Sequence, residues 1–292
     1  MPPAFYEKEA DFMKKRIFCA DTAEKEIASF LTDEARRIKI TVVDVTGSTN
    51  DDMKKAAREG EDEISLLVAY SQTAGKGSKG RSFFSPDGTG LYMSFLIRPD
   101  CSAGESTLLT PMAAVATALA IEKVTGAEAK IKWVNDIFVD GRKASGILTE
   151  GAAGRGGHRM EWAVVGIGIN IKRPDEGFPA EIENIAGGVY EGSEDIRNRL
   201  AAEVANNFVR YYRRLTDREF YGEYKDRLFI LSKQVTVTSA KESYPATAVD
   251  IDKDFHLKIR LSDGEERLLS SGEVSVRFNA QFAMPNAQSR DS

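Results

Sequence analysis

The sequence predicts a mixed α/β domain followed by a small β-barrel. Between residues 38 and 230, short β-branched segments alternate with segments of helical spacing, which is typical of a mixed sheet with flanking helices. Between residues 234 and 278 the pattern changes to five short strand-like segments, separated by turns such as Ser262-Asp263-Gly264. Strands so short and so closely spaced are typical of a small barrel. A length of 292 residues is enough for one domain of ordinary size and a smaller one.

The predicted elements of the larger domain follow one another along the chain. Apolar and β-branched runs predict strands at 38–45, 64–70, 91–97, 130–133, 137–139, 144–150 and 162–171. Helical spacing predicts helices at 20–37, 107–124, 194–215 and 219–228. Ser48–Asp51 is a good N-cap cluster for one more helix, Gly126 ends the helix at 107–124, and Asp140-Gly141 predicts a hairpin. Gly166 and Gly168 lie inside the last strand, where glycine indicates close approach of a ligand or another backbone.

Composition and charge exclude several classes of protein. A net charge of −5 and a pI near 5.4 argue against a general nucleic-acid binder, although residues 76–81 form a local basic segment. Cys19 and Cys101 form neither a disulfide framework nor a zinc motif, so we expect reduced thiols. Neither His158 nor His256 has an arrangement of Cys, Ser or Asp around it that identifies a catalytic triad. We interpret both histidines as structural or surface residues.

The sequence shows no sign of a membrane segment or of secretion. No apolar run reaches the length that spans a bilayer, and the N-terminus lacks the basic-then-apolar pattern of a signal peptide. We therefore expect a soluble, cytoplasmic protein.

Two segments carry the chemistry. The first is a glycine-rich loop that reads Gln72-Thr73-Ala74-Gly75-Lys76-Gly77-Ser78-Lys79-Gly80-Arg81. The second reads Lys132-Trp133-Val134-Asn135-Asp136 and continues Gly141-Arg142-Lys143-Ala144-Ser145-Gly146-Ile147-Leu148. A glycine-rich turn lets backbone N–H groups close on phosphate, and neighbouring Lys and Arg supply the countercharge. Together the segments indicate an enzyme that binds ATP and activates a small carboxylate.

Each of these features also has a purely structural explanation. The loop is neither a Walker motif nor a Rossmann turn, and a surface loop of this composition is common. Lys143 is consistent with an exposed hairpin lysine, Lys132 with a charge at a strand edge, Asn135-Asp136 with a turn, and Trp133 with a core residue. The combination of segments, in this order, favours the functional interpretation.

The motifs resemble those of biotin–protein ligases. The resemblance rests on Ser48-Thr49-Asn50, the loop from Gln72 to Gly80 with its continuation Ser85-Pro86, the Lys132–Leu148 motif, Val165–Asn170 and Gly272–Arg277. It spans roughly residues 40 to 278. It implies ATP-dependent, Mg²⁺-assisted conversion of biotin to biotinyl-5′-AMP, followed by transfer to a lysine of a biotin carboxyl carrier protein or domain.

The resemblance also implies a fold and a domain division. The fold is similar to that of class II aminoacyl-tRNA synthetases, a mixed and largely antiparallel sheet with flanking helices, followed by an SH3-like barrel. The expected divisions are an N-terminal helical extension (1–37), a catalytic domain (38–230), an SH3-like domain (231–279) and a flexible tail (280–292).

Site residues follow from the resemblance by matching position. Lys143 and Lys76 are the expected catalytic residues. The expected biotin contacts are Ser48, Thr49, Asn50, Gln72, Lys76, Gly77, Ser78, Lys143, Gly146 and Gly166. The expected ATP contacts are Lys79, Arg81, Asn135, Asp136 and Asn170, and Asp136 is the expected Mg²⁺ ligand.

The glycine loop departs from the family pattern. The family usually has Gly-Arg-Gly-Arg, and here Lys76 and Ser78 replace the two arginines. Lysine keeps a charge but loses the bidentate fork, and serine loses the second charge. We hypothesise weaker retention of the adenylate, unless Lys79 and Arg81 compensate. Phe83 also replaces a tryptophan that is frequent in the family.

Several alternatives stay open. A lipoate–protein ligase shares the fold and the catalytic lysine, and the Lys-Trp-x-Asn-Asp segment favours biotin. The loss of charge at Ser78 leaves room for a non-catalytic sensor of biotin or adenylate. Some relatives bind DNA through an N-terminal helix-turn-helix, which the non-basic residues 1–37 do not resemble, so we expect no DNA binding. Homodimers are common among relatives, and the sequence identifies neither the oligomeric state nor the acceptor protein.

Overall fold

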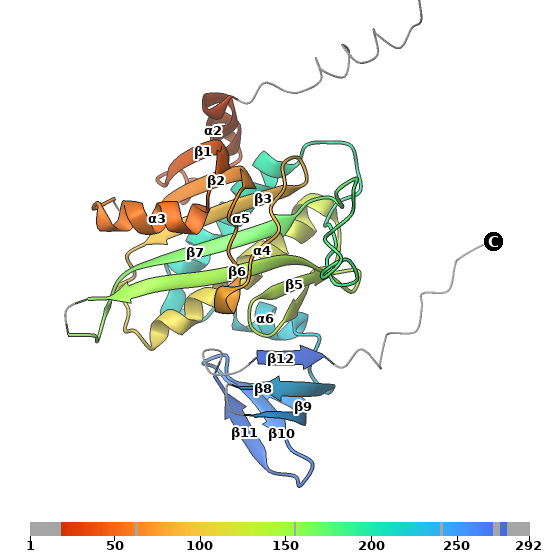
Figure 1. Ribbon diagram of the computed structural model, residues 1–292. Helices are drawn as coiled ribbons and strands as arrows, with labels where there is room; N and C mark the ends of the chain where they lie inside the picture. Colours follow the sequence, from red (N-terminus) through yellow and green to blue (C-terminus); the bar gives the residue numbers. More distant parts are fainter. Residues whose placement is uncertain (1–18, 62–63, 155, 240–241, 271–274, 279–292) are drawn as a thin grey trace, which may run out of the picture.

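The computed structural model describes residues 19–61, 64–154, 156–239, 242–270 and 275–278. Its larger sheet has seven strands in the order β1-β2-β3-β7-β6-β5-β4 (Figure 1). The strands are β1 (Lys39–Thr46), β2 (Ser65–Gln72), β3 (Gly90–Ile97), β4 (Lys130–Lys132), β5 (Asp136–Val139), β6 (Arg142–Ala153) and β7 (Met160–Asn170). Only β1 and β2 are parallel; the other neighbours are antiparallel. The predicted mixed, largely antiparallel sheet is confirmed.

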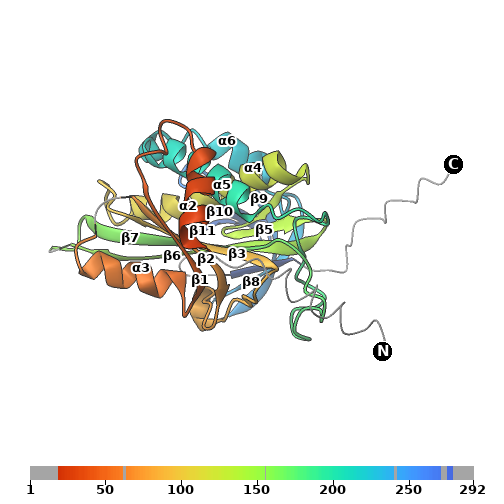
Figure 2. The same cartoon turned by 90° about the horizontal axis from the view of Figure 1, so that it is seen from above.

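Helices cover both faces of this sheet, unequally. One face carries α2 (Ala20–Ser29), α4 (Leu109–Thr125), α5 (Arg197–Tyr212) and α6 (Tyr221–Arg227), and the other carries α3 (Thr49–Arg58) (Figure 2). The main core lies on the four-helix side, where Phe95 stacks on Phe208 with ring centroids 3.9 Å apart. A smaller apolar cluster under α3 contains Met53, Leu67 and Trp162. Because α3 covers only part of its face, the rest of that face is available for a pocket.

Helix α4 is the core helix of the larger domain. With the short 3₁₀ turn η2 (Glu105–Leu108) it forms a 21-residue helical segment, and an 18-residue stretch of it has a mean hydropathy of 1.3, which is apolar enough to cross a membrane by length and composition alone. Of that stretch 67% is buried inside the fold, as expected of a core helix packed between the sheet and α5. It ends at Gly126, whose φ of 74° is the left-handed C-cap that glycine adopts without steric cost.

The second sheet has five antiparallel strands in the order β11-β10-β9-β8-β12. They are β8 (Gln234–Thr238), β9 (Ser243–Ile251), β10 (Leu257–Arg260), β11 (Glu266–Leu269) and β12 (Ser275–Phe278). The five predicted strands are thus present, and the SH3-like closure stays a prediction. His256 lies in the turn before β10, and its Nδ1 lies 2.9 Å from a carboxylate oxygen of Asp252.

The β9–β10 turn of the smaller sheet packs against the larger domain. Phe255 is 4% exposed and stacks on Phe220 with ring centroids 5.2 Å apart. Its carbonyl accepts a 2.9 Å hydrogen bond from Trp133 Nε1. Tyr224, fully buried, donates its hydroxyl to the carbonyl of Val134 at 3.1 Å. The smaller sheet therefore supports, through Phe255, the backbone just ahead of Asp136.

The ends of the chain differ from expectation in part. The helix predicted at 20–37 ends at Ser29, and turns follow it. The proposed domain extension 1–37 is described only from residue 19, and the tail 280–292 lies outside the described residues. Of the motif Gly272–Arg277, residues 271–274 also lie outside them, and β12 begins at Ser275.

Candidate active site

The floor of the pocket is backbone, on the sheet face that α3 leaves open. In one cross-strand row Gly168 of β7 pairs with Tyr92 of β3 and Gly146 of β6. In the next row Gly166 pairs with Ser94 and Leu148. Three of these six positions are glycine, so the middle of the floor has no side chains. The glycines inside the predicted strand therefore correspond to a cavity.

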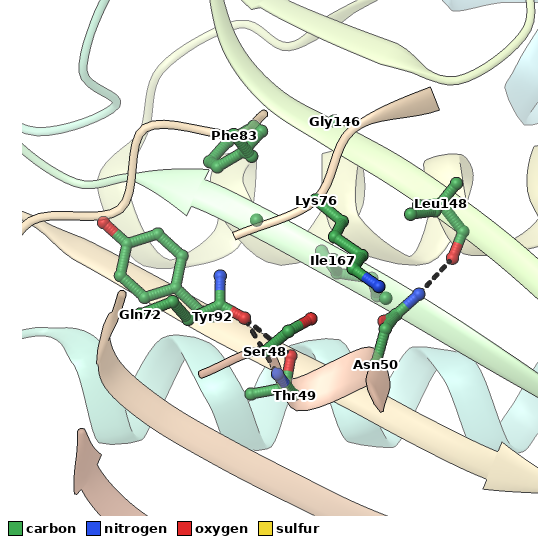
Figure 3. A pocket seen from close by; sticks show the side chains of 12 residues that line it. Ser48, Thr49, Asn50, Gln72, Lys76, Phe83, Tyr92, Gly146, Leu148 and Ile167 are labelled. Carbon is green, nitrogen blue, oxygen red and sulfur yellow. Dashed lines mark hydrogen bonds between the residues drawn. The ribbon is translucent and has the colours of Figure 1, made fainter. Parts of the chain in front are cut away.

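The inner end of the pocket is a buried polar network. Asn50 and Thr49, at the start of α3, are 4% and 3% exposed. The Ser94 hydroxyl lies 2.8 Å from Thr49 Oγ1 and 2.7 Å from Asn50 Oδ1. Asn50 Nδ2 donates to Glu150 Oε2 at 2.9 Å and to the Leu148 carbonyl at 3.3 Å (Figure 3). A network of this kind fixes the direction of its donors and acceptors, which is what recognition of a polar ring requires.

Gln72 caps the helix that carries this network. The Ser48 side chain makes no capping bond, although Ser48 occupies the N-cap position. Instead Gln72 Oε1 accepts the Thr49 backbone N–H at 2.9 Å, and Gln72 Nε2 donates to Ser85 Oγ at 3.1 Å. An uncapped N–H at a helix start is costly when buried, so Gln72 holds α3 in place against the glycine loop.

The glycine loop folds back on itself beside the pocket. Gly77 N–H donates to the Arg81 carbonyl at 2.7 Å, and Phe83 N–H donates to the Gly75 carbonyl at 2.9 Å. A Cβ at Gly75 would lie 2.4 Å from Ser85 Oγ and 2.5 Å from the Phe83 carbonyl. Only glycine fits there. Arg81 donates to the Ser78 hydroxyl at 2.8 Å and to its carbonyl at 3.1 Å, so its guanidinium lies over residue 78.

Phe83 forms one wall of the pocket. The edge of its ring contacts the floor at Gly168, where an added Cβ would lie 2.7 Å from Phe83 Cε1. It meets Tyr92 edge to face, with ring centroids 6.3 Å apart. Tyr92 is 1% exposed, and burial raises the pKa of its phenol, which donates to the Pro86 carbonyl at 3.2 Å. The wall therefore provides aromatic surface next to the polar inner end.

The two lysines of the sequence motifs border this pocket from different elements. Lys76 lines it directly, and its ammonium contacts the carboxylate of Asp51 at 2.7 Å. Lys143 lies on β6, and a Cβ at Gly146 would be 3.4 Å from its Nζ. The Lys143 ammonium pairs with Asp136 at 2.5 Å. Its backbone is held on one side by Phe138 of β5 and on the other by Ile185, whose carbonyl accepts the Lys143 N–H at 2.7 Å.

The expected ATP contacts are more scattered. Asn135 donates its side-chain amide to the Ile147 carbonyl at 2.8 Å, which fastens the β4–β5 turn to β6. Lys79 is exposed in the left-handed conformation, with φ 59°. Asn170 ends β7, opposite Gly90. Asp136 of β5 pairs with Gly146 of the pocket floor.

A magnesium ion fits this site only with help from a substrate. Asp136 is partly buried and its carboxylate faces Lys143. Among the described residues, the group of three potential metal ligands is Asp252, Asp254 and His256, in the turn between β9 and β10 and not at the pocket. Mg²⁺ commonly binds one or two carboxylates together with substrate phosphates and water, so the single carboxylate of Asp136 suits that mode.

The pocket brings together most, but not all, of the expected residues. Its lining consists of Ser48, Thr49, Asn50, Gln72, Lys76, Phe83, Tyr92, Gly146, Leu148, Gly166, Ile167 and Gly168. Gly77, Ser78 and Lys143 are expected biotin contacts that lie next to the lining without being part of it. The lining residues that were not among the expected contacts are Phe83, Tyr92, Leu148, Ile167 and Gly168. A usable signal existed for Gly168, because a glycine inside a predicted strand indicates close approach of a ligand or another backbone.

Comparisons with known proteins agree with this geometry. Residues 42–170 match the family described as the biotin/lipoate A/B protein ligase family. The chain is 34% identical over 200 residues to the bifunctional ligase/repressor BirA of Bacillus spizizenii, covering 68% of this chain and 61% of that protein. It is 28% identical over 244 residues to the biotin–[acetyl-CoA-carboxylase] ligase of Mycobacterium tuberculosis, covering 81% of this chain and 88% of that protein.

Solved structures show the same fold. A mutant of the biotin protein ligase from Aquifex aeolicus, in complex with biotin, superposes with a TM-score of 0.68 at 25% identity, covering 82% of this chain and 99% of that one. The ligase from the same organism in complex with biotin and ATP superposes equally well, with a TM-score of 0.68 at 24% identity and the same coverage of both chains.

Proposed function

Because the chain belongs to the biotin/lipoate A/B protein ligase family, we propose that it activates biotin with ATP and transfers it to a lysine of a carrier protein. The activity would be that of an AMP-forming biotin–[acetyl-CoA-carboxylase] ligase. The single observation that carries the proposal is the convergence of Lys76 and Lys143 on one glycine-floored pocket. Two cations beside a narrow pocket with a polar inner end suit a substrate that has a polar head and an anionic tail.

The inner end of the pocket suits the head of biotin. Its ring urea offers two N–H donors and one carbonyl acceptor. The network around Thr49, Asn50 and Gln72 contains both donors and acceptors in fixed directions. The ring would lie over the bare backbone of Gly166 and Gly168, with Phe83 as its apolar wall. This orientation leaves the carboxylate at the mouth of the pocket, near the lysines.

The first step would join two anions. An oxygen of the biotin carboxylate attacks the α-phosphorus of ATP, and the bond to the departing pyrophosphate breaks. Negative charge grows on the phosphate oxygens, and an ammonium placed beforehand stabilises it without further reorganisation. Lys143 suits this role because strands and the Ile185 backbone hold it from both sides.

The second step would transfer the acyl group. The amine of the acceptor lysine attacks the carbonyl of the mixed anhydride, the bond to AMP breaks, and an amide forms. The adenylate reacts with water, so exclusion of solvent by the glycine loop is part of the proposal. When bound, Mg²⁺ would neutralise phosphate charge, and Asp136 is the residue that would hold it. Lys79, Arg81, Asn135 and Asn170 remain proposed nucleotide contacts.

The test is transfer of labelled biotin to a purified biotin carboxyl carrier domain, with pyrophosphate release measured in parallel. We expect ATP-dependent labelling, and a loss of about 100- to 1,000-fold in the rate of pyrophosphate release for Lys143→Ala, as for removal of one preorganised charge stabiliser. A matched control is Lys123→Ala, a lysine that pairs with Glu203 on the four-helix side. Equal rates in the Lys143→Ala variant and the unaltered protein would contradict the proposal.

Two other functions share the fold. A lipoate–protein ligase would release pyrophosphate with lipoate and not with biotin. A non-catalytic sensor would bind biotin and release no pyrophosphate. The comparisons favour biotin, since both curated relatives described above carry ligase names and one names the biotin reaction.

Three further parts of the proposal concern the surroundings of the enzyme. We propose a cytoplasmic location, which suits the unpaired Cys19 and Cys101. We propose no DNA-binding role, because the net charge is −5. A homodimer would use an edge of the larger sheet, whose outer strands are β1 and β4, and light scattering of the purified protein would detect it.

A further inference from the structure

The ammonium of Lys76 is already paired with a carboxylate. Asp51, in the first turn of α3, contacts Lys76 Nζ with both oxygens at 2.7 Å. The Lys76 side chain reaches from the glycine loop across the pocket toward the start of α3 (Figure 3). A carboxylate is the group that the proposed substrate would bring to this lysine. The fold therefore places a carboxylate of the protein against one of the two cations of the site.

Asp51 has a second cation in reach. Lys54, one turn further along α3, lies 3.0 Å from Asp51 Oδ1. Lys54 is itself fixed by Glu150 at 2.6 Å, and its side chain is only 15% exposed. Glu150 in turn accepts the Asn50 amide at 2.9 Å. Burial raises the pKa of Asp51, and the hydrogen bonds from Lys76 and Lys54 outweigh it, so the net pKa is lowered and the group stays ionised at neutral pH.

This arrangement lets Asp51 release Lys76 without becoming an unpaired charge. If Lys76 turned to another anion, Asp51 would keep its contact with Lys54. The Lys143–Asp136 pair differs, because Lys143 is the ion-pair partner of Asp136 among the described residues and both side chains are less exposed, at 30% and 20%. Exchange of partners is therefore easier at Lys76 than at Lys143.

We propose that Asp51 is a placeholder for the substrate carboxylate: it holds Lys76 before the substrate arrives, and it keeps only its contact with Lys54 when an anionic substrate binds Lys76. This inference rests on the proposed function, since it takes biotin as that substrate. Asp51 is a positioning residue in this scheme and not a catalytic one. It sets how strongly a free carboxylate must compete for the lysine.

The exposure of the pair limits the size of the effect. Both side chains are 44% exposed, so solvent screens their attraction. Exposed ion pairs contribute up to about 1 kcal/mol, which corresponds to about a fivefold change in a dissociation constant. Removal of the competing carboxylate should therefore tighten binding of an anionic ligand by about two- to fivefold.

The experiment compares Asp51→Asn with Asp52→Asn by calorimetry with biotin and no ATP. Asp52 is in the same helical turn, so its replacement removes the same charge and the same interaction with the helix dipole. Its carboxylate accepts the Thr46 hydroxyl and makes no contact with Lys76 among the described residues. Each variant is also titrated with biotin methyl ester, which has no free carboxylate. The midpoint of thermal unfolding checks that both variants are folded.

We expect Asp51→Asn to tighten biotin by about two- to fivefold and to leave the ester within experimental error, while Asp52→Asn changes neither. Unchanged or weaker biotin binding in Asp51→Asn would overturn the placeholder role, as would an equal gain for the ester. Failure of the unaltered protein to bind biotin would refute the proposed function itself, and the two failures are therefore distinguishable.

Discussion

Replacement of Gly166 by alanine tests whether the Asn50 amide at the polar inner end of the pocket leaves room for a side chain at position 166. An added Cβ would lie 2.0 Å from Asn50 Oδ1 and 2.8 Å from Asn50 Cγ, whereas real Cβ contacts essentially never fall below 3.0 Å. The amide must therefore move by about 1 Å. It cannot move so far and keep its bonds to Ser94, Glu150 and Leu148, at 2.7, 2.9 and 3.3 Å.

The cost can be worked out from these bonds. A buried hydrogen bond contributes about 1 kcal/mol net, and one to a charged group about 1.5–3 kcal/mol, so loss of the two neutral bonds and the bond to Glu150 would cost about 3.5–5 kcal/mol. We expect the Gly166→Ala variant to lose about that amount in free energy of unfolding, measured by urea denaturation followed by circular dichroism. Biotin binding should weaken in parallel, because the same amide lines the pocket.

The control and the critical comparison use nearby positions. Gly47→Ala should change stability by less than about 0.5 kcal/mol, since a Cβ at Gly47 meets nothing within 4 Å. In an Asn50→Ala background the clash is gone, and Gly166→Ala should then cost little. If Gly166→Ala were equally destabilising with and without the Asn50 amide, the steric reasoning would be refuted.

Three other predictions concern the loop and the smaller sheet. Ser78→Arg should reduce the escape of biotinyl-adenylate into solution by restoring a charge in the loop, measured as free intermediate per turnover; an unchanged escape rate would refute the retention hypothesis. The pKa of Asp252 is lowered, because hydrogen bonds from His256 and the backbone outweigh the effect of burial. Its contribution to stability is therefore present above its ordinary pKa of 3.8 and is lost as pH falls, so Asp252→Asn should flatten the acid limb of a stability profile below about pH 4. Phe255→Ala should destabilise the protein by about 3–5 kcal/mol in denaturant unfolding, as for other buried aromatics, and a cost below about 1 kcal/mol would show that the junction of the two sheets does not depend on this ring.

Much of the fold could be predicted from local patterns. Strands such as β1 and β3 were predicted within one residue of their observed limits, because β-branched and apolar runs depend on neighbours in the sequence. Gly126 and Asp140-Gly141 were predicted as a helix end and a turn, and all three residues have positive φ. Signals for turns and helix ends depend on residues that are neighbours in the chain, so they can be recognised in the sequence alone.

The parts of the site that escaped prediction depend on long-range register. Gly166 and Gly168 signalled a close approach, yet nothing in the local sequence indicates that Asn50 and Phe83 are what approach them. The pairing of Lys76 with Asp51 likewise joins a loop to a helix 25 residues earlier. Such contacts depend on how β3, β7 and β6 align, which single-sequence patterns do not determine.

A floor made of main chain has a consequence for redesign. Strand registers set the depth of the cavity, and no side-chain replacement at Gly146, Gly166 or Gly168 can deepen it, since every change there adds atoms. The shape of the cavity can instead be altered at the side chains that line it, above all at Phe83, whose ring lies against Gly168. Shortening that ring, for example by Phe83→Leu, would create room for bulkier analogues of the ligand while leaving the sheet untouched. Selection for new ligand preferences would therefore act first on the segment from Gly75 to Ser85, and last on the strands beneath it.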